Sequence, residues 1–110
     1  MNILPVVTAD TPGPVFKIAA ETIDRGLDWS DKLTAIGVGV TLSNSVWTTI
    51  AGLTITDQGI IGNVTKVRIQ GGAFVSSGGG LGNSYLVKNQ VTLSDGEVFV
   101  RSLLVEIVGP

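Results

Sequence analysis

The chain has 110 residues, of which 44% are hydrophobic and 15% are charged, and its formal net charge is −2. This length suits one domain with its own core, and the composition excludes a disordered acidic or basic tail. The scattered Lys and Arg residues exclude a basic nucleic-acid surface, and the absence of cysteine and histidine excludes disulfides, thiol nucleophiles and the commonest general base.

Residues 1–14 are expected to form an extended N-terminal arm because prolines interrupt them. The arm contains Ile3, Leu4, Val6 and Val7, which are apolar enough to dock on another surface. One interpretation is a partly ordered tail, and the other is an arm that adds a strand to a neighbour's sheet. The remaining residues, 15–110, are expected to form the folded domain.

Neither a signal peptide nor a membrane span is expected. The N-terminus lacks a charged n-region followed by an apolar run, and no stretch approaches the roughly 18 apolar residues of a spanning helix. A chain without cysteine tolerates the reducing cytoplasm in which it is expected to be made. The low charge leaves a surface rich in neutral polar and apolar groups, which suits packing against other proteins.

The first half of the domain is the part where helix and strand are hardest to separate. Residues 15–20 are compatible with a strand or a short helix, and a helix is expected, if anywhere, within 18–34, where Gly26 interrupts the pattern. From Val38 the chain is β-branched and alternating, which predicts a strand that continues to residue 50, with Trp47 on its opposite face.

The second half has stronger strand signals. Residues 53–61 predict two short strands around a turn at Asp57–Gly59, and 63–70 alternate perfectly, as in a half-buried strand. Residues 84–108 predict a long hairpin around Asp95-Gly96, a preferred type I′ turn pair. Strands at this spacing favour an all-β fold, an immunoglobulin-like β-sandwich of about seven strands.

The glycine-rich segment 71–83 is not expected to bind phosphate. A phosphate loop precedes a helix, whose backbone N–H groups and dipole face the anion, whereas a strand follows this segment. It is expected to be a loop between strands, and no cofactor or metal is predicted for the chain.

The segment LDWSDKL, residues 27–33, holds the main acidic cluster of the chain, Asp28 and Asp31, with Asp24 nearby. A calcium site needs six to eight oxygens in a patterned loop, and a glycosidase pair needs a cleft. Neither pattern is present. Asp28, Ser30 and Asp31 are expected instead to cap local backbone donors, while Trp29 is buried and its N–H finds a partner.

Tyr85 begins the penultimate strand of the predicted sandwich. In immunoglobulin-like sandwiches a tyrosine near this position ties a chain corner through its hydroxyl. Tyr85 is therefore predicted to have a structural role.

Taken in order, these features resemble the small immunoglobulin-like virion proteins of tailed bacteriophages, of the fibre–tail adaptor type. The resemblance covers about residues 20–108 and is carried by an Asp-Trp-Ser-Asp corner, a Ser-x-Trp strand, a Gly-Leu pair, a V-x-I-x-G-G element, a Tyr-x-Val strand and a closing R-S-Leu. These positions are Asp28 to Asp31, Ser45 to Trp47, Gly52-Leu53, Val67 to Gly72, Tyr85 to Val87 and Arg101 to Leu103. The segment at Ala35–Gly37, the loop 73–83 and the arm depart from this pattern.

The resemblance implies a non-enzymatic structural protein that joins capsid, neck or tail to fibres, in a virion assembled in the host cytoplasm. Its expected partners are other virion proteins and further copies of itself, in a symmetric homo-oligomer. The residues predicted to make these contacts are Ile3, Leu4, Val6, Val7, Phe74, Val75 and Leu81. An alternative function is binding a host surface or carbohydrate, for which exposed aromatic side chains would be needed.

Overall fold

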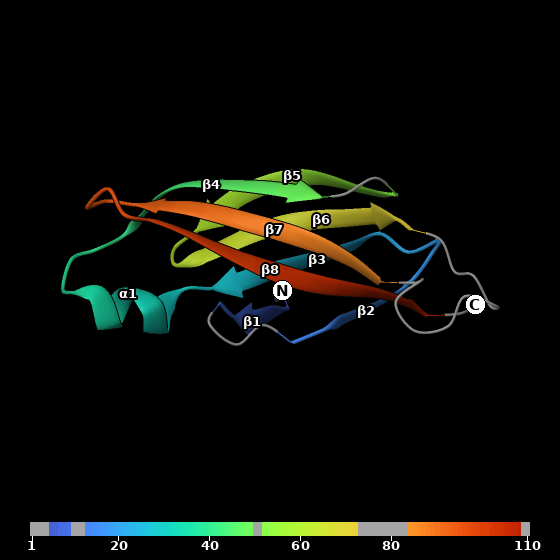
Figure 1. The fold of residues 1–110 in the computed structure, drawn as a ribbon, viewed down its shortest axis with the longest axis horizontal. Helices are drawn as coiled ribbons and strands as arrows, with labels where there is room; N and C mark the ends of the chain where they lie inside the picture. Colours follow the sequence, from blue (N-terminus) through green and yellow to red (C-terminus); the bar gives the residue numbers. More distant parts are fainter. Residues whose placement is uncertain (1–4, 10–12, 50–51, 73–83, 109–110) are drawn as a thin grey trace.

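The computed structural model describes residues 5–9, 13–49, 52–72 and 84–108. Within these ranges the chain forms two four-stranded sheets that pack face to face as a sandwich (Figure 1). The elements are β1 (Val6–Thr8), β2 (Val15–Ile18), β3 (Ile23–Asp28), α1 (Ser30–Ile36), β4 (Leu42–Thr49), β5 (Leu53–Ile61), β6 (Val64–Gly71), β7 (Ser84–Leu93) and β8 (Val98–Val108). Sheet A has the order β1-β3-β6-β5, and sheet B has the order β2-β8-β7-β4.

The core lies between the sheets and is built by the alternation of side chains along the strands. On β6, Thr65, Val67 and Ile69 are buried, and on β8 the inward positions include Leu103 and Val105. Each strand therefore has one face in the core and one outside. The predicted all-β sandwich is confirmed, and the arrangement is consistent with an immunoglobulin-like one, but the strands number eight rather than about seven.

The N-terminal part of the chain crosses from one sheet to the other. β1 pairs in parallel with β3 in sheet A, with Val6 opposite Gly26, and β2 pairs in parallel with β8 in sheet B. Within the predicted arm, Val6–Thr8 thus adds a strand to the chain's own sheet.

The stretch 18–34 contains a strand before its helix. β3 continues through Gly26, which is buried and pairs with Lys66 of β6, so the glycine does not break the element. The short helix α1 follows at Ser30–Ile36 and lies at one end of the sandwich, the same end as the β7–β8 turn (Figure 1).

Two predicted boundaries on the next strands are wrong. The expected turn at Asp57–Gly59 is a bulge within the continuous strand β5, where the register with β6 shifts between Thr56 and Gly59 and Asp57 has a φ of 52°. β4 begins at Leu42 instead of Val38, because Val38 projects fully into solvent and has no strand partner.

The hairpin between β7 and β8 has a different turn from the predicted one. A type I′ turn needs positive φ at both central residues, but of Asp95 and Gly96 only Gly96 has it, at 93°. The Gly96 N–H donates to the Leu93 carbonyl at 3.0 Å, and the Leu93 N–H donates to the Glu97 carbonyl at 2.8 Å. The turn is therefore a longer one that closes through a left-handed glycine.

Candidate functional site

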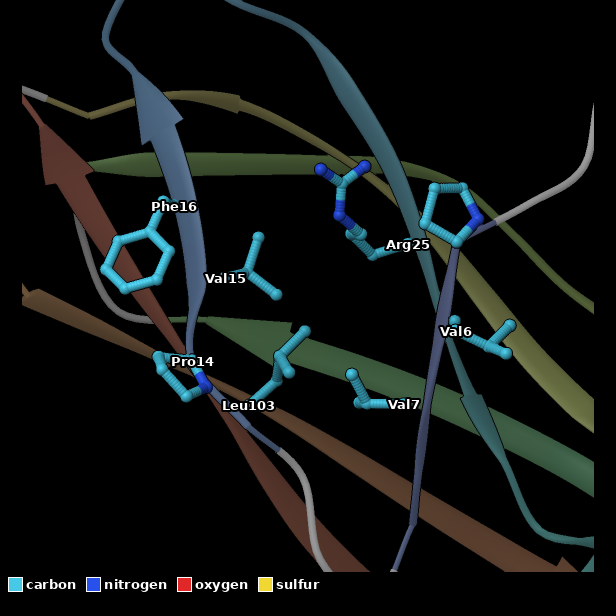
Figure 2. Close-up of a pocket in the computed structure, with 9 residues that line it drawn as sticks. Val6, Val7, Pro14, Val15, Phe16, Arg25 and Leu103 are labelled. Carbon is cyan, nitrogen blue, oxygen red and sulfur yellow. The ribbon is translucent and has the colours of Figure 1, made fainter.

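An open apolar groove lies at the seam where β1 of sheet A and β2 of sheet B run along the same side of the sandwich (Figure 2). Its volume is about 290 Å³. Leu103 of β8 is fully buried and forms its floor, while Phe16 on its rim is 57% exposed. The groove is lined by Pro5, Val6, Val7, Pro14, Val15, Phe16, Arg25, Gly26 and Leu103.

On the opposite side of the sandwich, a side chain of sheet A is hydrogen-bonded to the edge strand of sheet B. Gln58 of β5 accepts a hydrogen bond from the Trp47 N–H at 2.9 Å and donates one to the Trp47 carbonyl at 3.2 Å. This amide pairs with the edge of β4 as a neighbouring strand would, which removes backbone groups that could pair with another chain. β1 and β2 are also edge strands, so the groove is flanked by two sheet edges.

Among the described residues that line the groove, Arg25 is the one cation. Arg25 of β3 donates from Nη1 to the carbonyl oxygen of Asp24 at 2.7 Å. Figure 2 shows its guanidinium on the side of the groove that faces Val15 and Phe16. A planar guanidinium has five N–H donors, so donors remain for an anionic group in the groove.

The LDWSDKL segment forms the junction between β3 and α1. Asp28 Oδ1 accepts hydrogen bonds from the Ser30 backbone N–H at 2.9 Å and from the Ser30 hydroxyl at 2.6 Å. Trp29 is fully buried, and its backbone N–H donates to the Asn63 carbonyl at 2.8 Å. Asp31 is exposed in the first turn of α1, where a negative charge complements the helix dipole.

Cations hold this end of the sandwich against β8. Arg101 lies 5.7 Å from the Trp29 ring centroid and 5.7 Å from that of Phe99, and Lys32 of α1 lies 4.7 Å from the Phe99 centroid. Such contacts contribute about 0.5–1 kcal/mol each at partly exposed sites. The contacts of Lys32 with Phe99 and of Arg101 with Trp29 join α1 and the residue before it to β8 at this end of the core.

A chain of buried hydrogen bonds crosses the sandwich from this corner. The Trp29 indole N–H donates to the Thr65 hydroxyl at 3.1 Å, and this hydroxyl donates to Asn89 Oδ1 at 2.6 Å. The Asn89 amide then donates to the Ser45 hydroxyl at 2.8 Å and to the Val46 carbonyl at 3.3 Å. Because Trp29, Thr65 and Asn89 are fully buried, each polar group needs its partner. The network fixes how sheet A sits on sheet B.

A buried lysine ties the two sheets together near the other end. Lys17 of β2 is 1% exposed, and its ammonium donates to the carbonyls of Ile18 and Ala19 at 2.9 Å and of Gly71 at 2.6 Å. Burial lowers the pKa of Lys17 from its usual value of 10.5, and the charge of Glu21 partly opposes this. The three carbonyls use all the donors of the ammonium, so this lysine is a structural group.

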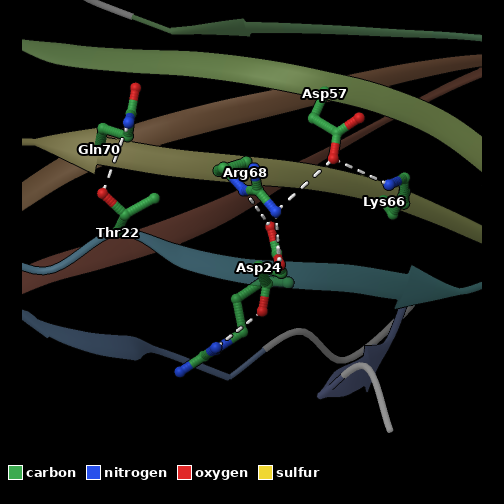
Figure 3. Close-up of polar contacts among 7 residues, drawn as sticks. Thr22, Asp24, Asp57, Lys66, Arg68 and Gln70 are labelled. Carbon is green, nitrogen blue, oxygen red and sulfur yellow. Dashed lines mark hydrogen bonds and ion pairs between the residues drawn. The ribbon is translucent and has the colours of Figure 1, made fainter. Parts of the chain in front are cut away.

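The outer face of sheet A carries a row of ion pairs (Figure 3). Arg68 of β6 contacts Asp24 of β3 through two bonds of 2.8 and 3.2 Å, and Lys66 contacts Asp57 of β5 at 3.1 Å. Arg68 also lies 3.8 Å from Asp57. The hydrogen bonds from Arg68 lower the pKa of Asp24 below its usual value of 3.8.

This pKa shift predicts a pH-dependent effect of Asp24→Asn. Because the folded pKa lies below the unfolded one, the ion pair stabilises the fold above about pH 4, and the contribution is lost as the pH falls through the folded pKa. Both side chains are about two-fifths exposed, at 44% and 42%, so solvent screens the pair. We expect this substitution to lower the Tm by up to about 4 °C at pH 7 and by clearly less at about pH 2. Thermal melts at both values check this, and an equal loss at both would contradict it.

The structure places only some of the predicted contact residues. Val6 and Val7 line the groove, whereas Ile3, Leu4, Phe74, Val75 and Leu81 lie outside the described residues. Tyr85 is partly buried at the start of β7, with its ring against Gly52.

Sequence reasoning missed the parts of the site that come from distant segments. Arg25 of β3 and Leu103 of β8 both line the groove. Because the two residues are far apart in the sequence, no local pattern indicates that they meet. Thr65 and Asn89 were detectable in principle, because each is a polar residue at a core-facing position of an alternating strand.

The described residues offer little support for the other kinds of site. Across these ranges, no three acidic side chains come together as metal ligands would. The helix found there is too short and too polar to cross a membrane. Phe16 is the one exposed aromatic residue among those described, so the described surface lacks the aromatic cluster that the carbohydrate-binding alternative needs.

The fold and its surfaces define a small β-sandwich protein that presents an open seam on one side and a row of ion pairs on one face. No curated protein matches the chain. A family model described as Podophage GP4 fiber-tail adaptor protein gp77 matches residues 17–106. The chain belongs to this family, which confirms the resemblance drawn from its motifs, and it is a structural component of a bacteriophage virion.

Proposed function

We propose that this chain is a non-enzymatic adaptor that attaches fibres to a phage tail through the shape of its surfaces. The family match over residues 17–106 is the observation that carries this proposal. The buried network and the buried lysine make the sandwich a rigid block, and rigid surfaces bind with a smaller entropic cost. The protein assembles with other virion proteins in the host cytoplasm, in several copies around the particle.

The groove between β1 and β2 is proposed to receive an extended apolar segment of a tail or fibre protein. Two sheet edges flank the groove, so a segment lying in it can pair with backbone groups while its side chains contact Val6 and Phe16. The Arg25 guanidinium would pair with an acidic side chain or terminal carboxylate of that segment. The predicted contact residues Ile3, Leu4, Phe74, Val75 and Leu81 remain candidates for the rest of the interface.

The groove is tested with the variant Val6→Asp. The variant is supplied to a phage from which the gene for this chain has been deleted. Val6 is 43% exposed, so the folded chain tolerates the change, but a bound segment would bury the new carboxylate. We expect fibre occupancy, measured by quantitative mass spectrometry of purified particles, to fall about tenfold or more. The matched control is Val38→Asp, at a fully exposed position distant from the groove, which should leave occupancy unchanged.

The outcomes separate the groove from the function. Normal fibre occupancy with Val6→Asp would exclude the groove and leave the adaptor role standing. Normal fibre occupancy in particles that lack the chain altogether would exclude the adaptor role itself. Saturable binding of the purified chain on a glycan array, without loss of fibres on deletion, would favour the carbohydrate-binding alternative.

A further inference from the structure

The edge of β1 that faces away from β3 has backbone groups available for pairing. The Pro5 carbonyl and the Ala9 N–H both bond to the backbone of β3, at 3.1 and 2.9 Å. Successive residues of a strand direct their backbone groups to opposite sides, so the N–H and C=O groups of Val6 and Thr8 point away from β3. Among the residues that the structure describes, these four groups have no hydrogen-bond partner.

The edge of β2, on the other side of the groove, is largely occupied by its own chain. The Ile18 N–H donates to Glu21 Oε1 at 2.8 Å, and the Ile18 carbonyl accepts from the Glu21 N–H at 2.9 Å. Pro14, directly before β2, has no N–H to offer. By the same alternation, Phe16 is the one residue within Val15–Ile18 that keeps both outward backbone groups for another strand. A segment in the groove therefore finds two pairing residues on β1 and one on β2.

Arg25 lies at the end of the groove where β1 begins. β1 pairs in parallel with β3, and the register puts Arg25 level with Pro5. Side chains alternate between the two faces of a sheet, so Arg25 points to the same face as Leu27, which is in the core. Its guanidinium extends from β3 toward Val15 of β2 (Figure 2). The cation is thus on the inward face of sheet A, beside the free edge of β1.

We propose that a segment of a tail or fibre protein adds to β1 as an antiparallel fifth strand of sheet A, with an acidic side chain on Arg25. Antiparallel pairs are slightly more stable than parallel ones, and at every second residue they exchange two hydrogen bonds. Two residues of the segment would pair in this way, one with Thr8 and the next but one with Val6. The inference rests on the proposed function and adds the edge, the direction and the sequence pattern of the bound segment.

The register determines which side chains of the segment enter the groove. Residues opposite Thr8 and Val6 point to the outer face of sheet A, because directly paired residues share a face. The residue between them points into the groove, whose lining is mainly apolar, and an apolar side chain fits there. The next inward position, two residues later, is level with Pro5 and therefore with Arg25.

An acidic side chain at this last position accounts for the charge of the groove. The segment and β3 would be two strand spacings apart, about 9.6 Å, which an extended glutamate and Arg25 span together. A terminal carboxylate is a main-chain group and would lie in the plane of the sheet instead of on its inward face. The expected pattern is therefore an apolar residue followed, two positions later, by an acidic one.

The test uses the same deletion phage and measures fibre occupancy by quantitative mass spectrometry. Thr8→Pro removes an outward N–H that makes no bond to β3, and it should lower occupancy about tenfold or more. Thr8→Val keeps this N–H at a similar side-chain volume and should leave occupancy at its normal level. Arg25→Glu should lower occupancy to a similar extent as Thr8→Pro, whereas Lys88→Glu, the same charge change at an exposed position of sheet B, should not.

A photo-crosslinker identifies the bound segment. With p-benzoylphenylalanine in place of Thr8, irradiated particles should yield a cross-link to a tail or fibre peptide that has the apolar–x–acidic pattern. Replacing the acidic residue of that peptide by arginine should restore fibres to particles that carry Arg25→Glu, to within about threefold of normal occupancy.

The outcomes separate this inference from the proposed function. Circular dichroism confirms folding, and Arg25→Glu leaves the β1 backbone unchanged if Thr8→Pro does not fold. Normal occupancy with Arg25→Glu, or with folded Thr8→Pro, would overturn the inference, even where Val6→Asp removes fibres. A cross-link to a second copy of this chain, or to a peptide without the acidic residue, would also overturn it. Normal occupancy in particles without the chain would exclude the proposed function instead.

Discussion

Thr65→Val should destabilise the protein by about 2–4 kcal/mol, although the two side chains have nearly the same volume. The change removes the hydroxyl that joins Trp29 Nε1 to Asn89 Oδ1, at 3.1 and 2.6 Å. Both partners are buried, so each is left without a hydrogen bond, at a cost of about 1–3 kcal/mol. Chemical denaturation gives the free energy of unfolding directly.

Thr54→Val is the matched control for this experiment. Thr54 lies on β5 in the same sheet, but it is exposed, so the same chemical change should shift stability by less than about 0.5 kcal/mol. A loss at Thr65 no larger than that at Thr54 would show that the buried network does not hold the sheets together.

Gly72→Ala should be as damaging, for a steric reason. Gly72 has a φ of +89°, and a Cβ atom there would lie 2.6 Å from Ile107 Cδ1 and 3.3 Å from Leu53 Cδ2. The left-handed backbone costs about 1–2 kcal/mol for alanine, and forcing extra volume into the core adds about 1–3 kcal/mol. We expect a total loss of about 2–5 kcal/mol, measured as a fall in Tm and in the free energy of unfolding.

Gly96→Ala separates the two causes. Gly96 has a similar φ of +93°, but a Cβ atom there meets nothing within 4 Å. It should therefore lose only the backbone contribution, about 1–2 kcal/mol. Equal losses at the two glycines would mean that Ile107 yields freely and that this end of the core is less tightly packed than its geometry indicates.

The sequence was sufficient for those parts of the fold that depend on local periodicity. The alternation at residues 64–71 and 84–108 predicts strands and their buried faces, because each position there has one neighbour in the core and the next in solvent. The burial of Trp29 was also predicted, since it is a large apolar side chain within a polar turn.

The misplaced elements depend on tertiary pairing. Asp57 reads as a turn residue, but β6 pairs with both halves of β5 and keeps the strand continuous through a bulge. Gly26 reads as a helix breaker, yet it pairs with Lys66 inside a sheet. In both cases long-range hydrogen bonds override the local preference, and no single-sequence pattern reports them.

The candidate site was predictable only in part for the same reason. Val6 and Val7 were predicted to be contact residues because they are apolar and lie among prolines, and both line the groove. The groove itself exists because β1 joins one sheet and β2 the other, which brings Arg25 and Leu103 to one place. The positions of these residues in the sequence do not indicate that they lie close together.

The most direct test of the adaptor role is to locate this chain in a reconstruction of the whole virion. We expect copies of the sandwich to occupy the joint between tail and fibre, with the β1–β2 groove in contact with a neighbouring protein. Density for the chain at a position that touches no fibre and no tail protein would contradict this role.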